Sequence, residues 1–239
     1  MFARYAYAPN SLGYCGPHEP STLLSGSPEQ VEDLARRFSG AWPYLQVLAK
    51  MTGTPDPLDH RLVESYWLGG GLGAGLDPQE FTDELLAVIG PQAGHYWHHL
   101  TGDLAHEAVA NHCFHVFGVY PWSRLLGKGH DRQPLNVLDN CRITWGTVLS
   151  SDGATLTVRC RRLLYDDTDK LTLSGHITRV IENGVGDRPA AAEAGPGDHV
   201  ALHWGRVCDR LTFDQLDTLA QSTHRQLRVT NRRLTREIG

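Results

Sequence analysis

The sequence predicts an α+β fold in which helices come first and a small β-barrel with a final helix follows. Up to residue 134, apolar side chains recur at helical spacing between capping and stop signals. From residue 135 the pattern changes to short alternating runs rich in threonine, valine, isoleucine and leucine, which is typical of strands. We therefore expect two domains: a histidine-rich, all-α helical bundle over residues 1–134, and a barrel plus a C-terminal helix over residues 135–239.

Start and stop signals repeat along the first domain. The clearest is a capping-box sequence at residues 27–30, Ser-Pro-Glu-Gln, in which serine and glutamine cap each other's backbone. Asp-Pro pairs open two further helices, and Gly-Gly and Gly-Pro pairs end them. Residues 1–26 show no sustained period and predict an ordered coil. The predicted helices cover residues 28–53, 57–68, 78–89 and 92–118.

The second domain predicts short strands and then a helix. Asp152-Gly153 lies between two alternating runs and is a strong hairpin signal. Residues 183–198 are rich in glycine, proline and alanine and predict a flexible loop, and a helix is expected from about Phe213. The predicted strands lie within residues 137–149, 154–165, 170–181 and 199–208.

Bulk composition narrows the classes of partner. The net charge is −5 and the pI about 6.2, so the chain lacks the excess positive charge that nucleic acid requires, and we expect no nucleic-acid partner. No run approaches the ~20 apolar residues that cross a bilayer, so we expect no membrane partner. Five cysteines, odd in number and widely spaced, favour a reducing compartment. These features together predict a cytoplasmic protein.

Thirteen histidines are many for 239 residues, and most lie in the middle third of the chain. Because histidine is the common transition-metal ligand, they raise the expectation of metal or proton chemistry. His112 and His115 stand three residues apart in an aromatic, apolar run, so both rings can converge on one ion or cofactor. Glu64 and Cys15, the latter in a Cys-Gly-Pro-His turn beside the bundle, complete this candidate site. The alternative is a pair of core histidines satisfied by Glu64 or by a backbone carbonyl.

Two motifs of the second domain resemble the HypC-type chaperones of [NiFe] hydrogenase maturation. Residues 141–148, Cys-Arg-Ile-Thr-Trp-Gly-Thr-Val, are similar to the family's opening Cys-x-x-Ile-Pro-Gly-x-Val, and a predicted hairpin follows. Residues 197–205, Gly-Asp-His-Val-Ala-Leu-His-Trp-Gly, are similar to its Gly-Asp-x-Val-Leu-Val-His-x-Gly strand. Residues 211–219 are similar to the helix after that strand, and the order agrees over about residues 139–228.

The resemblance implies an OB-like barrel and a role as an accessory or chaperone protein, docking on the hydrogenase large subunit or on maturation proteins. It also implies that Cys141 and His203 face each other across the closed sheet and handle active-site iron that carries cyanide and carbon monoxide. A thiolate and an imidazole suit such a metal. Two positions depart from the family pattern. Cys141 is internal and lacks the free amine of an N-terminal cysteine, and Trp145 replaces a proline.

Three functions remain open at this point. The first is the maturation accessory protein, which is not an enzyme. The second is an enzyme that binds a metal or haem through His112 and His115 of the helical domain. The third is a non-catalytic protein-interaction module in which both sets of histidines are structural.

Overall fold

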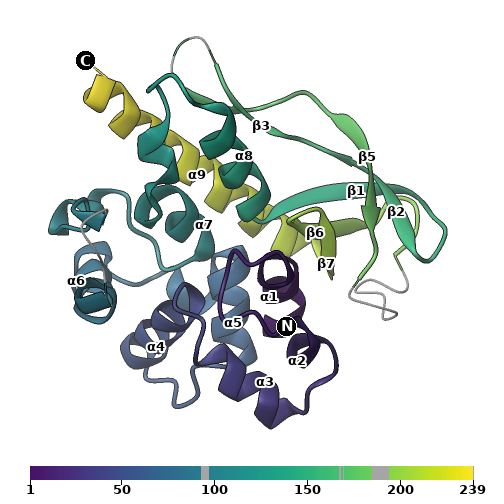
Figure 1. The fold of residues 1–239 in the computed structure, drawn as a ribbon, viewed down its shortest axis with the longest axis horizontal. Helices are drawn as coiled ribbons and strands as arrows, with labels where there is room; N and C mark the ends of the chain where they lie inside the picture. The colour runs from purple at the N-terminus through teal and green to yellow at the C-terminus, as the bar shows by residue number, and fades with distance from the viewer. Residues whose placement is uncertain (93–96, 167, 169, 185–193, 239) are drawn as a thin grey trace.

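The computed structural model describes residues 1–92, 97–166, 168, 170–184 and 194–238. The first part of the chain is helical, the strands follow, and a long last helix runs back along both (Figure 1). A π-helical turn, His115–Val119, follows α7. Short 3₁₀ turns lie at Gly71–Gly73, Gly90–Gln92, Gly102–His106 and Pro121–Leu125. The helices are α1 (Phe2–Ser11), α2 (Pro20–Ser25), α3 (Pro28–Ala35), α4 (Ala41–Thr52), α5 (His60–Leu68), α6 (Pro78–Ile89), α7 (His112–Phe114), α8 (Arg132–Cys141) and α9 (Phe213–Ile238).

Five strands close into a small mixed barrel in the order β1-β2-β5-β7-β6. Neighbours pair antiparallel, except that β5 and β7 meet in a single parallel pair, Glu182 with Arg206. The predicted Asp152-Gly153 hairpin joins β1 to β2. The strands are β1 (Thr144–Ser151), β2 (Thr155–Cys160), β5 (Ile177–Glu182), β6 (His199–His203) and β7 (Arg206–Leu211), with a separate pair, β3 (Leu163–Tyr165) and β4 (Leu171–Leu173). The α+β class is confirmed, whereas the helical bundle and the OB-like topology stay predictions.

The N-terminal segment is helical where an ordered coil was predicted. Phe2, Tyr5 and Ala6 are buried, and their spacing places them on one face of α1. Pro9 lies inside the last turn of α1. Because proline has no N–H, the carbonyl of Tyr5 loses its usual partner four residues on and is free to accept another hydrogen bond. Prolines and glycines in this segment hide its helical period.

The helix predicted over residues 28–53 is two helices, α3 and α4, with a change of direction between them. A side chain on Gly40 would come within 3.2 Å of the Nε2 atom of His115, so glycine here lets the backbone pass close to the π turn. The next helix, α5, begins at His60 rather than after Asp56-Pro57, because Asp59 is the residue that caps it. The predicted helix from Asp77 to Gly90 is confirmed as α6.

The capping box at the start of α3 is formed as predicted. The Ser27 hydroxyl accepts from the backbone N–H of Gln30, and the Gln30 side chain accepts from the backbone N–H of Ser27. We expect Ser27→Ala to lower the free energy of unfolding by about 1 kcal/mol, because a helix N–H loses its acceptor. Urea unfolding checks this, with exposed Ser21→Ala as the control; an equal loss in both variants would contradict it.

Two segments have a secondary structure different from the one predicted. The described residues of 92–118 do not form a long helix: they hold the 3₁₀ turn Gly102–His106, one turn of α7 and the π turn. Residues 137–141, predicted to begin the first strand, are the end of α8. Val137, Leu138 and Cys141 are buried on one helical face. Because the run is so short, its apolar residues are compatible with the period of a strand as well as with that of a helix. Residues 93–96 and 185–193, parts of the predicted helix and flexible loop, lie outside the described residues.

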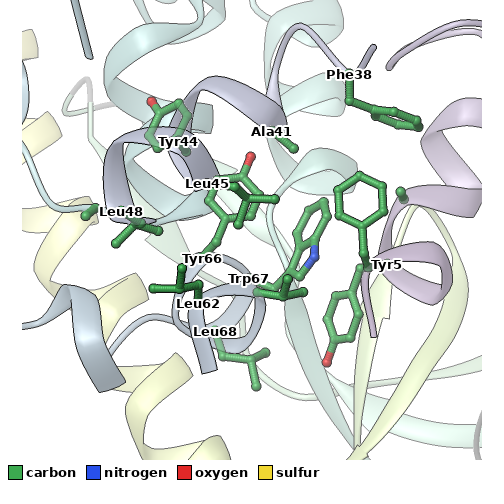
Figure 2. Packing of buried hydrophobic residues seen from close by; sticks show 14 of the residues in the cluster. Tyr5, Phe38, Ala41, Tyr44, Leu45, Leu48, Leu62, Tyr66, Trp67 and Leu68 are labelled. Carbon is green, nitrogen blue, oxygen red and sulfur yellow. The ribbon is translucent and has the colours of Figure 1, made fainter. Parts of the chain in front are cut away.

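The helices and the barrel share one hydrophobic core. Its largest cluster joins residues of α1, α4, α5 and α6 to Ala201 and Cys208 of the barrel. Figure 2 shows Trp67 at its centre, between Tyr66 and Tyr5, with ring centroids 4.8 and 5.5 Å away. The predicted boundary at residues 134–135 falls inside α8. The division into two domains stays a prediction, and the shared core shows that the two parts pack as one body.

The last helix fastens the two parts together. The Arg233 guanidinium pairs with the buried carboxylate of Glu107 at 2.5 Å, and Arg225 donates to the Glu107 carbonyl. Further along the helix, the Asn231 amide exchanges hydrogen bonds with the backbone of Leu171 in β4. Although α9 has 26 residues, it is too polar to cross a bilayer, and no other helix in the described part of the chain is long and apolar enough.

Candidate metal centre

His112, Cys141 and His203 converge where the helices meet the barrel. One donor atom from each side chain lies within 4.8 Å of the other two. All three residues are at most 9% exposed, so the donors lie in the interior. Two imidazoles and a thiol at this spacing are a ligand set for a transition metal, and three protein ligands leave a coordination position open.

Each of the three ligands lies at the end of a helix or strand. His112 begins α7, whose N-cap Asn111 accepts from the Phe114 N–H and donates to Ser222 of α9 at 2.7 Å. Cys141 is the last residue of α8. His203 ends β6 and pairs with Arg206, which leaves a two-residue hairpin between them. The ligands therefore come from three elements that are distant in sequence.

The hydrogen bonds of the histidines leave nitrogens available to a metal. The Nδ1 atom of His203 lies 2.7 Å from the carbonyl oxygen of Tyr5, so Nδ1 carries the proton and donates. This carbonyl is the one that Pro9 leaves without a helical partner. Nε2 of His203 is then unprotonated, buried and without a hydrogen bond, and Nδ1 of His112 is likewise buried without a partner. Fixing one imidazole nitrogen so that the other can bind a metal is the usual arrangement in metal sites.

Burial keeps all three groups neutral. Burial lowers the pKa of His203 to about 4, against the hydrogen bond to the Tyr5 carbonyl and a smaller influence of the Cys141 carbonyl, both of which raise it. Burial lowers the pKa of His112 well below its ordinary value, and neighbouring His203 and His115 lower it further. The pKa of the Cys141 thiol is raised by burial and then by Cys15. The centre is therefore two neutral imidazoles and a protonated thiol, and a bound cation would displace the thiol proton.

The three ligands face an aromatic cavity of about 270 Å³. Its walls include Cys15 and His115, both predicted as members of a helical-domain site. Burial raises the pKa of Cys15 to about 12 and lowers that of His115 to about 3. The other residues around the cavity are Pro9, Tyr14, Tyr66, Trp67, Trp97, His112, Tyr120, Pro121, Trp122, Val137, Cys141, His203 and Trp204.

Trp204 has an unusual backbone at the edge of the centre. It is the one non-glycine residue with positive φ in the described part of the chain, at 48°, and Gly205 follows at 76°. Two positive φ values define a type I′ hairpin turn, for which Asn-Gly is the preferred sequence. A bulky residue there is strained, which points to a use for its side chain. The indole N–H is buried without a hydrogen-bond partner, Trp204 lines the same cavity as Cys141, and the indole lowers the pKa of the Cys141 thiol against the effect of burial.

We expect Trp204→Asn to keep the turn, since asparagine tolerates positive φ, and to remove the indole N–H that stabilises a thiolate at Cys141. Loss of a group that supports a ligand weakens metal binding by about tenfold or more. Metal titration of the variant against the unaltered protein checks this. Unchanged affinity would show that the indole does not act on the thiol.

The structure unites two sites that the sequence predicts separately. His112 of the predicted helical-domain site joins Cys141 and His203, whereas His115 lines the cavity outside this set of three. Glu64 is not among the cavity residues, and its carboxylate accepts from Gln215 at 2.8 Å. Trp204 was not among the predicted site residues, and the Trp-Gly sequence of its two-residue hairpin is the sequence signal that marks it.

One detail of the prediction is corrected. Cys141 and His203 do approach each other, but not across the inside of the barrel. Cys141 ends a helix rather than opening a strand, so the pair meets at the side of the barrel that faces the helices. The inside of the barrel is filled by apolar side chains: Val148, Leu156, Val158, Cys160, Ile181, Ala194, Val200, Leu202 and Val207.

The fold and the site define an α+β protein with a buried candidate metal centre of two histidines and a cysteine. Comparison with protein families places the chain: residues 1–237 match the family of unknown function DUF6390, and the chain belongs to that family. No significantly similar curated protein and no significantly similar solved structure was found. The match covers both the helices and the barrel, so the elements that supply the three ligands lie within one family unit.

Proposed function

We propose that this chain is an accessory protein of [NiFe] hydrogenase maturation, in which His112, Cys141 and His203 hold an iron ion that is in transit to the enzyme. One observation carries the proposal: the two residues that the resemblance to HypC implies as a pair lie within 4.8 Å of each other and of a third donor. Most sequence-distant pairs of residues in a chain of this length do not meet. The iron is cargo rather than a resident cofactor.

The third donor, His112, compensates for the main departure from the HypC pattern, which is the missing free amine beside Cys141. An internal Cys141 has no free amine to offer beside its thiol. His112, from the helical part, supplies a nitrogen at that place, and its Nδ1 atom is buried without a hydrogen bond. This supports the view that the helical part is integral to the ligand set, rather than an added contact surface.

The size of the cavity favours this proposal over a haem enzyme. Pockets for drug-sized molecules measure roughly 300–1,000 Å³. A cavity of about 270 Å³ is below that range, so it suits a metal with a few diatomic ligands better than a porphyrin. Its aromatic walls and neutral ligands would also accommodate an iron group of low net charge, because burying uncompensated charge is costly.

The chain's own residues have distinct roles in this proposal. The Tyr5 carbonyl orients His203, Asn111 fixes the helical turn of His112, and the Trp204 indole stabilises Cys141 as a thiolate once its proton is lost. The OB-like barrel would dock on the hydrogenase large subunit or on a maturation protein in the cytoplasm. With a net charge of −5, nucleic acid is a poor candidate partner.

The test is purification without oxygen or chelator from cells that make a [NiFe] hydrogenase. We expect iron bound in about equimolar amount, infrared bands of iron-bound cyanide and carbon monoxide, and co-purification of the large subunit or a maturation protein. Cys141→Ser should lose all three signals, and Cys113→Ser should retain them. Iron without diatomic ligands and without a partner would favour an enzyme instead, and absence of iron would contradict the proposal.

A further inference from the structure

A short segment, the Cys15 strap (residues 12–18), lies along the cavity. The Asn10 side-chain amide anchors it by donating to the carbonyls of Cys15 and Pro17, at 2.8 and 2.5 Å. The Tyr14 ring stacks on Trp204, with centroids 4.1 Å apart and planes within 22°. Tyr14 is 49% exposed, whereas the Cys15 side chain lines the cavity. The strap thus presents a ring to solvent and a thiol to the metal centre.

We propose that Cys15 is a fourth ligand of the metal centre, which converts an open site of three ligands into a closed Cys₂His₂ site. This inference rests on the proposed function, since it concerns the same ion. The open state, with the strap raised, would accept or release the iron group. The closed state would hold the metal and exclude water.

The position of Cys15 supports this role. Two thiols, Cys15 and Cys141, line the cavity in the described part of the chain, together with the imidazoles of His112 and His203, each of which has a buried nitrogen without a hydrogen bond. Two thiolates and two imidazoles form a complete tetrahedral set for a bare ion such as zinc or cobalt(II). On a six-coordinate iron the same four ligands leave two positions for diatomic ligands. The influence of Cys15 on the pKa of Cys141 agrees with two thiols that share one space.

Cys15 lies outside the set of three donors within 4.8 Å, so the strap must shift for its sulfur to bind. Gly13, before the Tyr14–Cys15 pair, has a φ of 75° and no neighbouring atom within 4 Å of an added side chain, which gives the backbone room to turn. Gly16, after the pair, packs its backbone onto the ring of Phe38, where an added side chain would come within 2.7 Å. The Gly16 end of the strap is therefore packed against Phe38, whereas the Gly13 end is held by backbone hydrogen bonds from Gly13 and Tyr14 to the carbonyls of Asn10 and Pro9, which a shift of the strap would break.

The stack of Tyr14 on Trp204 links the strap to the turn that holds His203 and to the indole beside Cys141. A partner that took up the exposed Tyr14 ring would separate this stack and draw Cys15 away from the centre. Docking and release of the iron group would then be coupled through one aromatic contact.

Cobalt(II) provides the test, because the intensity of its sulfur-to-cobalt charge-transfer band scales with the number of bound thiolates. We expect the unaltered protein to show the intensity of two thiolates, and Cys15→Ser and Cys15→Ala each to show about half. Cys113→Ser is the matched control, since burial raises the pKa of Cys113 and of Cys15 alike to about 12. The control should keep the full intensity. Circular dichroism verifies that each variant is folded.

The outcomes separate this inference from the proposed function. If the unaltered protein binds cobalt with the intensity of a single thiolate, and Cys15→Ser leaves the band unchanged, the fourth ligand is wrong while the metal centre stands. If the unaltered protein binds no cobalt, the proposed function and this inference both fail. Equal loss in Cys15→Ser and Cys113→Ser would also overturn the assignment of Cys15.

Discussion

Removing any one of the three ligands should weaken iron(II) binding by at least about 100-fold. Loss of a residue that merely supports a ligand already costs 10–100-fold, and a missing ligand costs more. We expect this for Cys141→Ser, His203→Gln and His112→Gln, measured by competition with a chelator under anaerobic conditions. The effect of His112→Gln is the informative one, because the resemblance to HypC implies Cys141 and His203 alone.

Two variants serve as controls for the ligand series. His199→Gln removes the histidine at the other end of β6, and Cys113→Ser removes a thiol outside the cavity; both should bind iron as the unaltered protein does. Thermal unfolding of the metal-free variants separates loss of a ligand from loss of the fold. If His112→Gln bound iron with unchanged affinity while Cys141→Ser did not, the helical part would have no place in the ligand set.

The metal-free protein should lose much of its stability between pH 7 and pH 5. Burial lowers the pKa of His203 to about 4 and that of His115 to about 3, whereas an unfolded histidine titrates near pH 6.5. The unfolded state therefore binds more protons than the folded state as pH falls below about 6.5, and stability is lost in that direction. Each histidine contributes a loss of about 2 kcal/mol by pH 5, and His112 adds to it.

Urea unfolding at pH 7, 6 and 5 measures this loss. His115→Phe should remove about 2 kcal/mol of the pH dependence, because phenylalanine fills similar space without a titrating group. His60→Gln is the control for the loss of a histidine that is exposed rather than buried. A stability that stayed flat from pH 7 to pH 5 would mean that these histidines are protonated or hydrated in the folded protein.

The features of the fold that were predicted correctly depend on local sequence signals. The capping box at Ser27, the Asp77 cap and the Asp152-Gly153 hairpin are formed because each depends on residues within four positions. The failures have local causes too. Pro9 conceals α1, and residues 137–141 have an apolar spacing that suits a strand as well as the last turn of a helix.

The members of the candidate site could be proposed from the sequence, but the way they come together could not. The resemblance implied the pairing of Cys141 with His203, and the apolar surroundings of His112 marked it as a candidate ligand. Their union depends on how α7, α8 and β6 pack, which is set by the shared core and by contacts such as Asn111 with Ser222. The spacing of residues along the sequence does not predict such long-range contacts. The Tyr5 carbonyl is free to accept from His203 because Pro9 has no N–H, and this can be inferred only once α1 is known to be a helix.

A crystal structure of the iron(II)-loaded protein, with anomalous scattering measured at the iron edge, tests the central claim most directly. We expect one iron peak at about 2.0–2.3 Å from a nitrogen of His112, a nitrogen of His203 and the sulfur of Cys141. An iron peak on surface carboxylates, with these three side chains binding no metal, would contradict the account.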